Sequence, residues 1–86
     1  MSVYILAGAR TPSGSFLSTL AAVGATRLGA TAIESAVERA SIGKDNVDEV
    51  FMGNVVQAGV GQAPARQAAI FAGLSNTTPC TTINKV

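Results

Sequence analysis

A single amphipathic stretch, residues 25–40, restricts the folds open to this 86-residue chain more than any other feature. At about 100° per residue, one half of its helical wheel is apolar and the other half is polar. The apolar half carries Leu28, Ala32, Ile33, Ala36, Val37 and Ala40, and the polar half carries Arg27, Thr31, Glu34 and Glu38. The pattern predicts a helix that packs on one face, with Gly43 at its C-terminal cap.

Apolar runs rich in β-branched residues stand on both sides of this helix and predict three strands. The expected strands are residues 3–7, the interrupted run 50–52 and 55–56, and residues 81–86. Gly53 and Asn54 stand inside the interrupted run, where a bulge or a close approach of the backbone is expected.

A second helix is expected over residues 65–72, after a glycine-containing loop at residues 57–63. Pro64 suits the first turn of a helix because that position needs no backbone N–H donor, and Gly73 marks the end. Strand, helix, strand, helix, strand is the alternation that normally builds a parallel sheet. We therefore predict an α/β fold, as one small domain or as part of a larger one.

Composition argues against several classes of function. Six basic and five acidic residues give a net charge of +1, which attracts neither nucleic acid nor an anionic membrane surface. Charged residues interrupt every apolar run before it reaches the ~20 residues of a membrane span. With one cysteine and no histidine, the chain cannot form an internal disulfide and is poorly equipped to bind zinc. The start lacks a basic leader, so we expect a cytoplasmic location, with peroxisomes or mitochondria as alternatives.

The last predicted strand runs to Val86 without a turn or a polar tail. Three strands and two helices would also leave the faces and edges of the sheet poorly covered at this size. We therefore expect the chain to be part of a longer polypeptide.

Cys80 is the strongest nucleophile type in the composition, but its surroundings predict an inert side chain. A thiol becomes reactive beside a histidine, a cation or a helix N-terminus, whereas Cys80 follows Pro79 and leads into an extended segment. Free cysteines of this kind are usually packed in the interior.

The remaining charged residues predict structural roles. Glu34 and Glu38 lie on the polar side of the first helix, where a solvated face is expected rather than acid–base chemistry. Arg10, in the loop after the first strand, is expected to bind backbone carbonyls or to form an ion pair, although it also offers a contact for an anion.

The loop around Gly59 to Gln62 offers an alternative of another kind. A glycine loop before a helix can present free N–H groups to a phosphate. However, Pro64 stands where the dinucleotide motif needs glycine or alanine, and no Walker lysine is present. A tight connection between strand and helix is the preferred interpretation, with Gln62 pointing into a neighbouring pocket.

Several segments, taken in order, resemble the N-terminal region of thiolases, and most closely the acetyl-CoA C-acetyltransferases within that family. The resemblance covers essentially the whole chain. It is carried by residues 3–16, Leu28-Gly29-Ala30, Gly53-Asn54-Val55, residues 61–67 and Ile83-Asn84-Lys85-Val86.

The resemblance implies a fold and a reaction. Each half of a thiolase is a βαβαβαββ domain, so residues 1–86 would be an incomplete N-terminal domain, its β-α-β-α-β portion, with no second domain. The implied reaction condenses two acetyl-CoA molecules to acetoacetyl-CoA and CoA, or runs in reverse, through a cysteine acyl-enzyme. No resident cofactor is implied, because acetyl-CoA and CoA are substrate and product. The family also implies a homodimer or homotetramer.

The resemblance also assigns roles to individual positions. The nucleophilic cysteine would follow Val86 directly, so these 86 residues would contain no catalytic residue and would be inactive alone. Gln62 and Asn84 would support the nucleophile pocket. The main alternative is a non-catalytic dimerisation or interaction module derived from a thiolase. The acyl-chain preference depends on residues beyond this chain.

Overall fold

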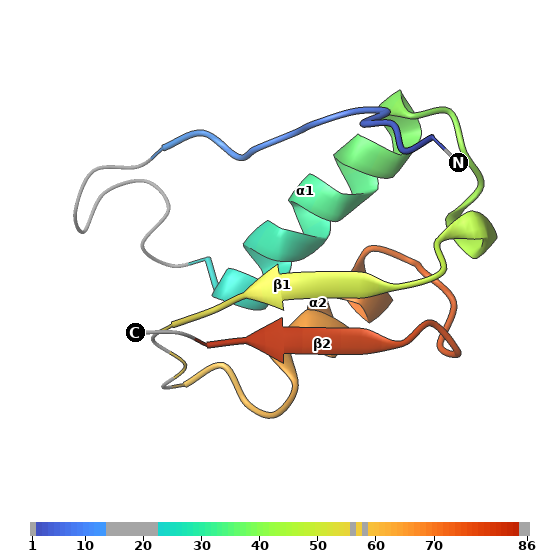
Figure 1. Ribbon diagram of the computed structural model, residues 1–86. Helices are drawn as coiled ribbons and strands as arrows, with labels where there is room; N and C mark the ends of the chain where they lie inside the picture. The colour runs from blue at the N-terminus through green and yellow to red at the C-terminus, as the bar shows by residue number, and fades with distance from the viewer. Residues whose placement is uncertain (1, 14–22, 56, 58, 85–86) are drawn as a thin grey trace.

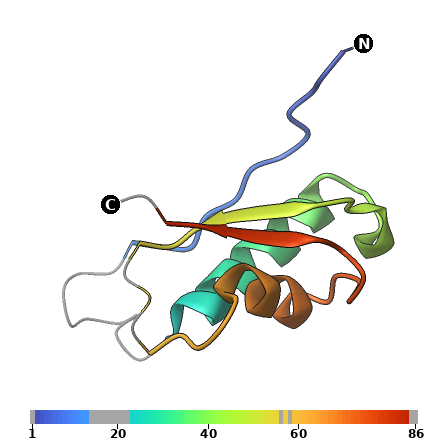
Figure 2. The ribbon, with the colours of Figure 1, turned by 60° about the horizontal axis from the view of Figure 1, so that its bottom comes forward.

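The structure is a computed structural model that describes residues 2–13, 23–55, 57 and 59–84. Along these residues the elements are α1 (Ala25–Arg39), the short 3₁₀ turn η1 (Lys44–Asn46), β1 (Val50–Gly53), α2 (Pro64–Phe71) and β2 (Cys80–Ile83). The two strands pair in parallel, from Val50 opposite Cys80 to Gly53 opposite Ile83. Both helices lie on the same side of this sheet (Figures 1 and 2). The α/β fold with parallel strands is therefore confirmed.

The first helix begins and proceeds as predicted, but it ends differently. The Gly24 carbonyl accepts hydrogen bonds from the backbone N–H groups of Arg27 and Leu28. At the other end, Ser41 takes the left-handed conformation at φ 57°. Gly43 is extended at φ −72° and precedes η1. The prediction of Gly43 as the cap is wrong because the Ser41 N–H bonds to the Glu38 carbonyl, which tightens the last turn and closes the helix before Gly43.

Small side chains form the centre of the domain. Among the described residues, the buried ones are Ala30, Pro64, Ala65, Ala68, Ala69, Ala72 and Leu74, together with Thr26 and Thr78. At Gly29, an added Cβ would lie 3.2 Å from the Ala68 Cβ and 2.6 Å from the Met52 Cε. The backbones of α1 and α2 therefore approach closely, which the small side chains of α2 permit.

The second helix matches its prediction closely. Pro64 occupies the first turn of α2. Gly73 follows the helix in the left-handed conformation at φ 89°, and its N–H bonds to the Ile70 carbonyl. This conformation is one that glycine adopts without the steric cost of a Cβ.

The two paired strands are shorter than predicted. β1 ends at Gly53, so Val55 lies outside the strand, and Val56 is outside the described residues. β2 begins at Cys80, one residue before the prediction, and ends at Ile83. The predicted continuation through Lys85 and Val86 falls outside the described residues.

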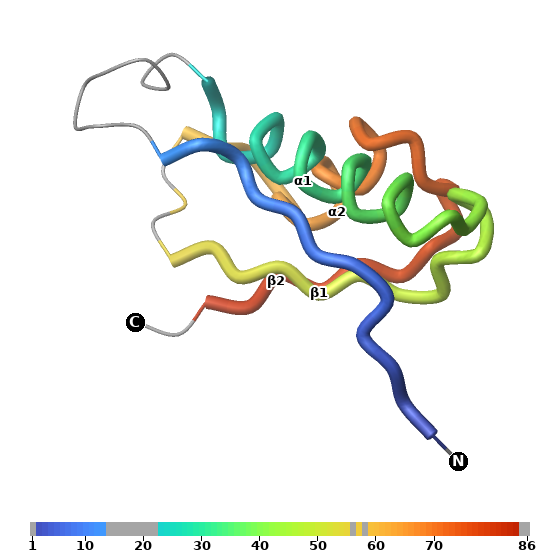
Figure 3. The backbone as a smooth tube through the Cα atoms, turned by 90° about the horizontal axis from the view of Figure 1, so that it is seen from above, coloured from blue at the N-terminus to red at the C-terminus, as the bar shows by residue number. Residues whose placement is uncertain are grey.

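The predicted strand at residues 3–7 is not formed. This segment runs apart from the two paired strands, with Val3 90% and Ile5 96% exposed (Figures 2 and 3). Its apolar, β-branched composition is insufficient alone, because a strand also needs the hydrogen bonds of a neighbour. Arg39 on α1 ties the end of the segment down by donating from Nη1 to the Gly8 carbonyl at 3.0 Å. No helix among the described residues is long and apolar enough to span a membrane.

Candidate functional site

The loop between β1 and α2 has an unusual backbone. Gly59 and Gly61 have φ values of 79° and 78°, and Ala63, which directly precedes α2, has φ 48°. Glycine tolerates the left-handed region freely, whereas alanine does not. The loop therefore keeps this path only because other contacts hold it there.

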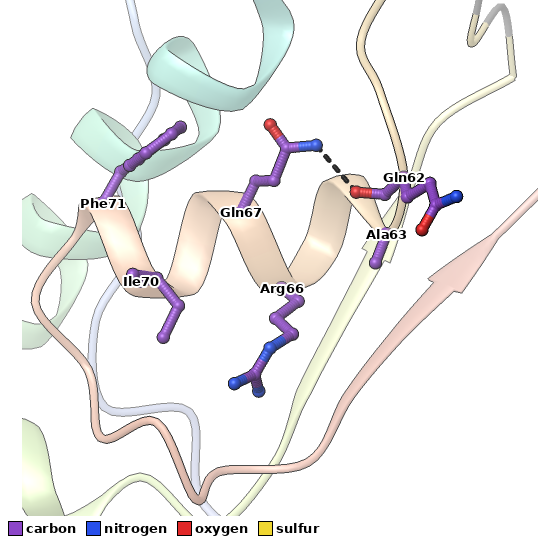
Figure 4. Close-up of a pocket in the computed structure, with 6 residues that line it drawn as sticks. All are labelled: Gln62, Ala63, Arg66, Gln67, Ile70 and Phe71. Atoms are coloured by element: carbon purple, nitrogen blue, oxygen red, sulfur yellow. Dashed lines mark hydrogen bonds between the residues drawn. The ribbon is translucent and has the colours of Figure 1, made fainter.

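Gln67 on α2 supplies two of those contacts. Its side-chain Nε2 donates hydrogen bonds to the backbone carbonyls of Val60 at 2.8 Å and Gln62 at 2.7 Å. Figure 4 shows the second of these bonds across the start of α2. One amide thus bridges the helix and two residues of the loop.

Gln62 lies at the edge of a shallow pocket of about 210 Å³. The pocket is lined by Gln62, Ala63, Arg66, Gln67, Ile70 and Phe71 (Figure 4). The Arg27 guanidinium lies 3.7 Å from the centre of the Phe71 ring, in cation–π contact. The predicted position of Gln62 beside a pocket is compatible with this geometry, whereas its role in a reaction stays a prediction.

Asn84 lies beyond the end of β2 and ties the ends of the two strands together. Its side-chain Nδ2 donates to the Val55 carbonyl at 2.8 Å, while the Asn54 N–H donates to the Ile83 carbonyl at 3.0 Å. Asn84 does not line the pocket beside Gln62. The structure therefore brings Asn84 to the carboxyl end of the sheet without joining it directly to Gln62.

Thr82 connects these two regions, and sequence reasoning did not single it out. Its Oγ1 accepts a hydrogen bond from the backbone N–H of Ala65 in the first turn of α2, at 3.0 Å. This bond satisfies one of the free donors at the helix start from a neighbouring strand. Neither Thr82 nor Gln67 carries a motif signal, because threonine is ordinary in a strand and a lone glutamine is ordinary in a helix.

The hydrogen bond from the Ala65 N–H to Thr82 Oγ1 argues against the alternative that this loop binds a nucleotide phosphate. A phosphate at this loop would need the free N–H groups at the start of α2. Thr82 already occupies the N–H of Ala65. The tight connection between strand and helix therefore remains the preferred interpretation of this loop.

Cys80 lies at the opposite end of β2 from Asn84. It is a free, half-buried cysteine whose Sγ donates to the Thr78 carbonyl at 3.3 Å. No group of three His, Cys, Asp or Glu side chains among the described residues is placed to hold a metal ion. The environment of Cys80 is compatible with the inert role that the sequence predicts.

The charged residues on the first helix and its neighbouring loop behave as expected. Glu34 and Glu38 are exposed, and Glu34 forms a surface ion pair with Lys44 at 3.7 Å.

A second cavity of about 580 Å³ is lined by Arg10, Pro12, Ser13 and Arg39. There Arg10 donates to the Thr11 carbonyl at 3.2 Å, so the predicted binding of a backbone carbonyl by Arg10 is confirmed.

Comparison with known proteins extends these observations. Residues 3–86 match the sequence model of the family described as "Thiolase, N-terminal domain". The chain is 58% identical over 84 residues to the mitochondrial acetyl-CoA acetyltransferase of Mus musculus, which covers 98% of this chain and 20% of the relative. It is 62% identical, with the same coverage, to mitochondrial acetyl-CoA acetyltransferase B of Xenopus laevis. The cytosolic acetyl-CoA acetyltransferase ERG10 of Gibberella zeae is 60% identical over 98% of this chain and 21% of its own length.

A solved structure is also similar. The crystal structure of Acat5 thiolase from Ascaris suum in complex with coenzyme A superposes with a TM-score of 0.93 and 41% sequence identity. The match covers 96% of this chain and 22% of that one. The chain therefore spans about a fifth of the length of the curated relatives that it matches.

Proposed function

The chain belongs to the thiolase family, and we propose that it forms the opening part of the N-terminal domain of an acetyl-CoA C-acetyltransferase. The observation that carries this proposal is the 62% identity to an acetyl-CoA acetyltransferase over 98% of the chain. The proposed reaction condenses two molecules of acetyl-CoA to acetoacetyl-CoA and CoA, or cleaves acetoacetyl-CoA in the reverse direction.

The proposed mechanism proceeds through a covalent intermediate. A cysteine thiolate attacks the carbonyl carbon of acetyl-CoA, a thioester to the protein forms, and CoA leaves as its thiolate. A base in the full-length protein takes a proton from the methyl group of a second acetyl-CoA, and the resulting carbanion attacks the thioester carbonyl. The new carbon–carbon bond forms as the carbon–sulfur bond breaks, and the cysteine leaves as its thiolate. The nucleophile is expected directly after Val86, so the 86 residues alone would provide a scaffold without activity.

Within this scheme, Gln62 and Asn84 are proposed to support the nucleophile pocket. The hydrogen bonds of Asn84 to Val55 and of Asn54 to Ile83 fix the end of β2, which leads toward the expected nucleophile. The amide of Gln62 offers both a donor and an acceptor beside the pocket. Acyl-CoA is the proposed substrate, and a homodimer or homotetramer is the proposed assembly.

The covalent intermediate gives the first test. The full-length protein that contains this chain, incubated with acetyl-CoA and examined by intact-mass and peptide mass spectrometry, should gain one acetyl group on a cysteine other than Cys80. The Cys80→Ser variant should keep this acetylation, because Cys80 lies at the far end of β2 from Asn84. Acetylation that disappears in a folded Cys80→Ser variant would contradict the inert role of Cys80. A full-length protein that never acetylates would favour the alternative of a non-catalytic interaction module.

Supporting residues give a second test. In the full-length protein, Gln62→Ala and Asn84→Ala should each lower kcat for acetoacetyl-CoA cleavage by about tenfold, the loss expected for one hydrogen bond of about 1.4 kcal/mol. Steady-state kinetics measure the loss, and thermal melting checks that the fold is retained. Unchanged kinetics in both variants would remove Gln62 and Asn84 from the site.

Location in the cell is a separate matter. The relatives named above include mitochondrial and cytosolic proteins, which correspond to two of the compartments predicted from the sequence. We keep the cytoplasm as the proposed location, and cell fractionation with an antibody to this chain tests it.

A further inference from the structure

Both N–H donors of the Gln67 side-chain amide are used by the loop that they face. An amide nitrogen carries two N–H donors, and here it lies within hydrogen-bond distance of two carbonyls, those of Val60 and Gln62. Gly61 stands between these two residues, and an added Cβ there would lie 3.0 Å from the same nitrogen. Gln67 therefore binds both residues that flank Gly61, and it lies where a side chain at Gly61 would begin.

The backbone carbonyl and the side-chain amide of Gln62 differ in whether another residue holds them. Its backbone carbonyl is held by Gln67 at 2.7 Å. Its side-chain amide points away from Gln67 and from α2 (Figure 4), and it makes no hydrogen bond to another described residue. The backbone is thus fixed while the functional group stays available.

A second contact fixes the loop relative to the sheet. The backbone N–H of Ala65 bonds to Thr82 Oγ1 on β2, only two residues before Asn84. Because Gln67 lies on the same short helix as Ala65, the loop, the helix start and the end of β2 form one connected unit. A displacement of the loop would move Gln62 relative to that strand end.

We propose that Gln67 is a positioning residue, which clamps the loop at residues 59–63 so that the Gln62 amide is presented to the acyl-CoA substrate. The inference rests on the proposed function. It goes beyond it by assigning a role to a residue that contacts the loop backbone and acts through Gln62. A shift of about 1 Å in a positioned group can lower a rate by as much as about 100-fold, so a clamp of this kind influences catalysis without touching the reacting atoms.

The experiment uses the full-length protein that contains this chain, with two substitutions at Gln67. Gln67→Met keeps the length of the side chain but removes both N–H donors, whereas Gln67→Lys supplies an ammonium group that can donate to the same carbonyls. We expect Gln67→Met to lower kcat for acetoacetyl-CoA cleavage by about tenfold with the KM for CoA nearly unchanged. Gln67→Lys should recover most of that loss. Glu38→Gln, on the exposed face of α1, is the matched control and should leave both constants unchanged.

A double substitution separates positioning from a general structural role. If Gln67 acts through Gln62, the variant with both Gln67→Met and Gln62→Ala should be no slower than Gln62→Ala alone. Losses that multiply in the double variant, or an equal loss in Gln67→Met and Gln67→Lys, would overturn the proposal.

Hydrogen exchange provides a readout that does not depend on activity. Exchange of the hydrogen-bonded backbone amides of Val60, in the loop, and Ala65, at the helix start, should accelerate at least tenfold in Gln67→Met and return toward wild type in Gln67→Lys. Unchanged exchange would overturn the clamp. A wild-type protein without any acetoacetyl-CoA cleavage would refute the proposed function and the link from Gln67 to catalysis, while exchange would still decide whether Gln67 holds the loop.

Discussion

Ala68→Leu is expected to lower the free energy of unfolding of the domain by about 3 kcal/mol, near the upper end for overpacking a well-filled core. Ala68 is 0% exposed, and its Cβ lies where only 3.2 Å separates it from the Cβ that a side chain at Gly29 would carry. Leucine has no free volume at this crossing, so α1 and α2 must separate or adopt strained rotamers. Urea unfolding of the protein that contains this chain, followed by circular dichroism and by hydrogen exchange of both helices, measures the loss.

Ala25→Leu is the matched control, because it adds the same side chain at a solvent-exposed position. Ala25 is the first residue of α1 and is exposed. Ala25→Leu should change the free energy of unfolding by no more than about 0.5 kcal/mol, as surface substitutions usually do. If Ala68→Leu is tolerated as well as Ala25→Leu, the close approach of the two helices is wrong.

Gly61→Val is expected to reduce acetoacetyl-CoA cleavage by about tenfold in the full-length protein, as much as the loss of the Gln62 amide itself, because it misplaces the loop that carries Gln62. The φ of 78° at this position disfavours any side chain by about 1–2 kcal/mol, and a β-branched one by more. The new Cβ would also meet the Gln67 amide at 3.0 Å and displace the clamp. Steady-state kinetics and thermal melting of the variant measure the effect.

Gly59→Val is the matched control for this prediction. Gly59 has nearly the same φ, 79°, but among the described residues an added Cβ there meets no atom within 4 Å beyond its chain neighbours. This variant carries the backbone strain alone, so its loss of activity should be clearly smaller than the loss in Gly61→Val. Equal losses in the two variants would show that strain, rather than the contact with Gln67, governs the loop.

The predicted helices agree with the structure because their signals are local. The wheel of residues 25–40 separates exposed Glu34 and Glu38 from half-buried Leu28, Ile33 and Val37, and the predicted end of α1 lies within one residue of the observed end. Pro64 and Gly73 mark the limits of α2 through backbone preferences that act within one or two residues. Such preferences operate whatever else the chain contacts.

The formation of strands and the end of the first helix depended on contacts with residues that local sequence patterns do not identify. Residues 3–7 have strand-forming composition, yet they stay extended and exposed because none of the described strands lies beside them. Ser41, rather than Gly43, takes the left-handed position because the last turn of α1 closes earlier than the glycine suggests. Pairing and chain reversal are decided by the surrounding structure, which overrides local preference.

Some residues of the candidate site could also be predicted from the sequence, whereas others could not. The glycine loop alone placed Gln62 beside a pocket, but the supporting roles of Gln62 and Asn84 came only from the resemblance to thiolases, since neither residue belongs to a self-sufficient chemical motif. Gln67 and Thr82 were not accessible, because their role consists of hydrogen bonds across 5 to 17 residues of sequence. Nothing in the identity of a glutamine or a threonine tells which distant carbonyl or N–H it will meet.

The sequence by itself therefore determined the α/β class, the two helices and the family, because these follow from periodicity, from single-residue backbone preferences and from an ordered set of segments. Only the tertiary structure decided which strands pair, how closely α1 approaches α2 at Gly29, and how Gln67 and Thr82 hold the loop beside the sheet. The physical reason is that these features consist of contacts between residues far apart in the chain, whose energies appear only when packing brings the partners together.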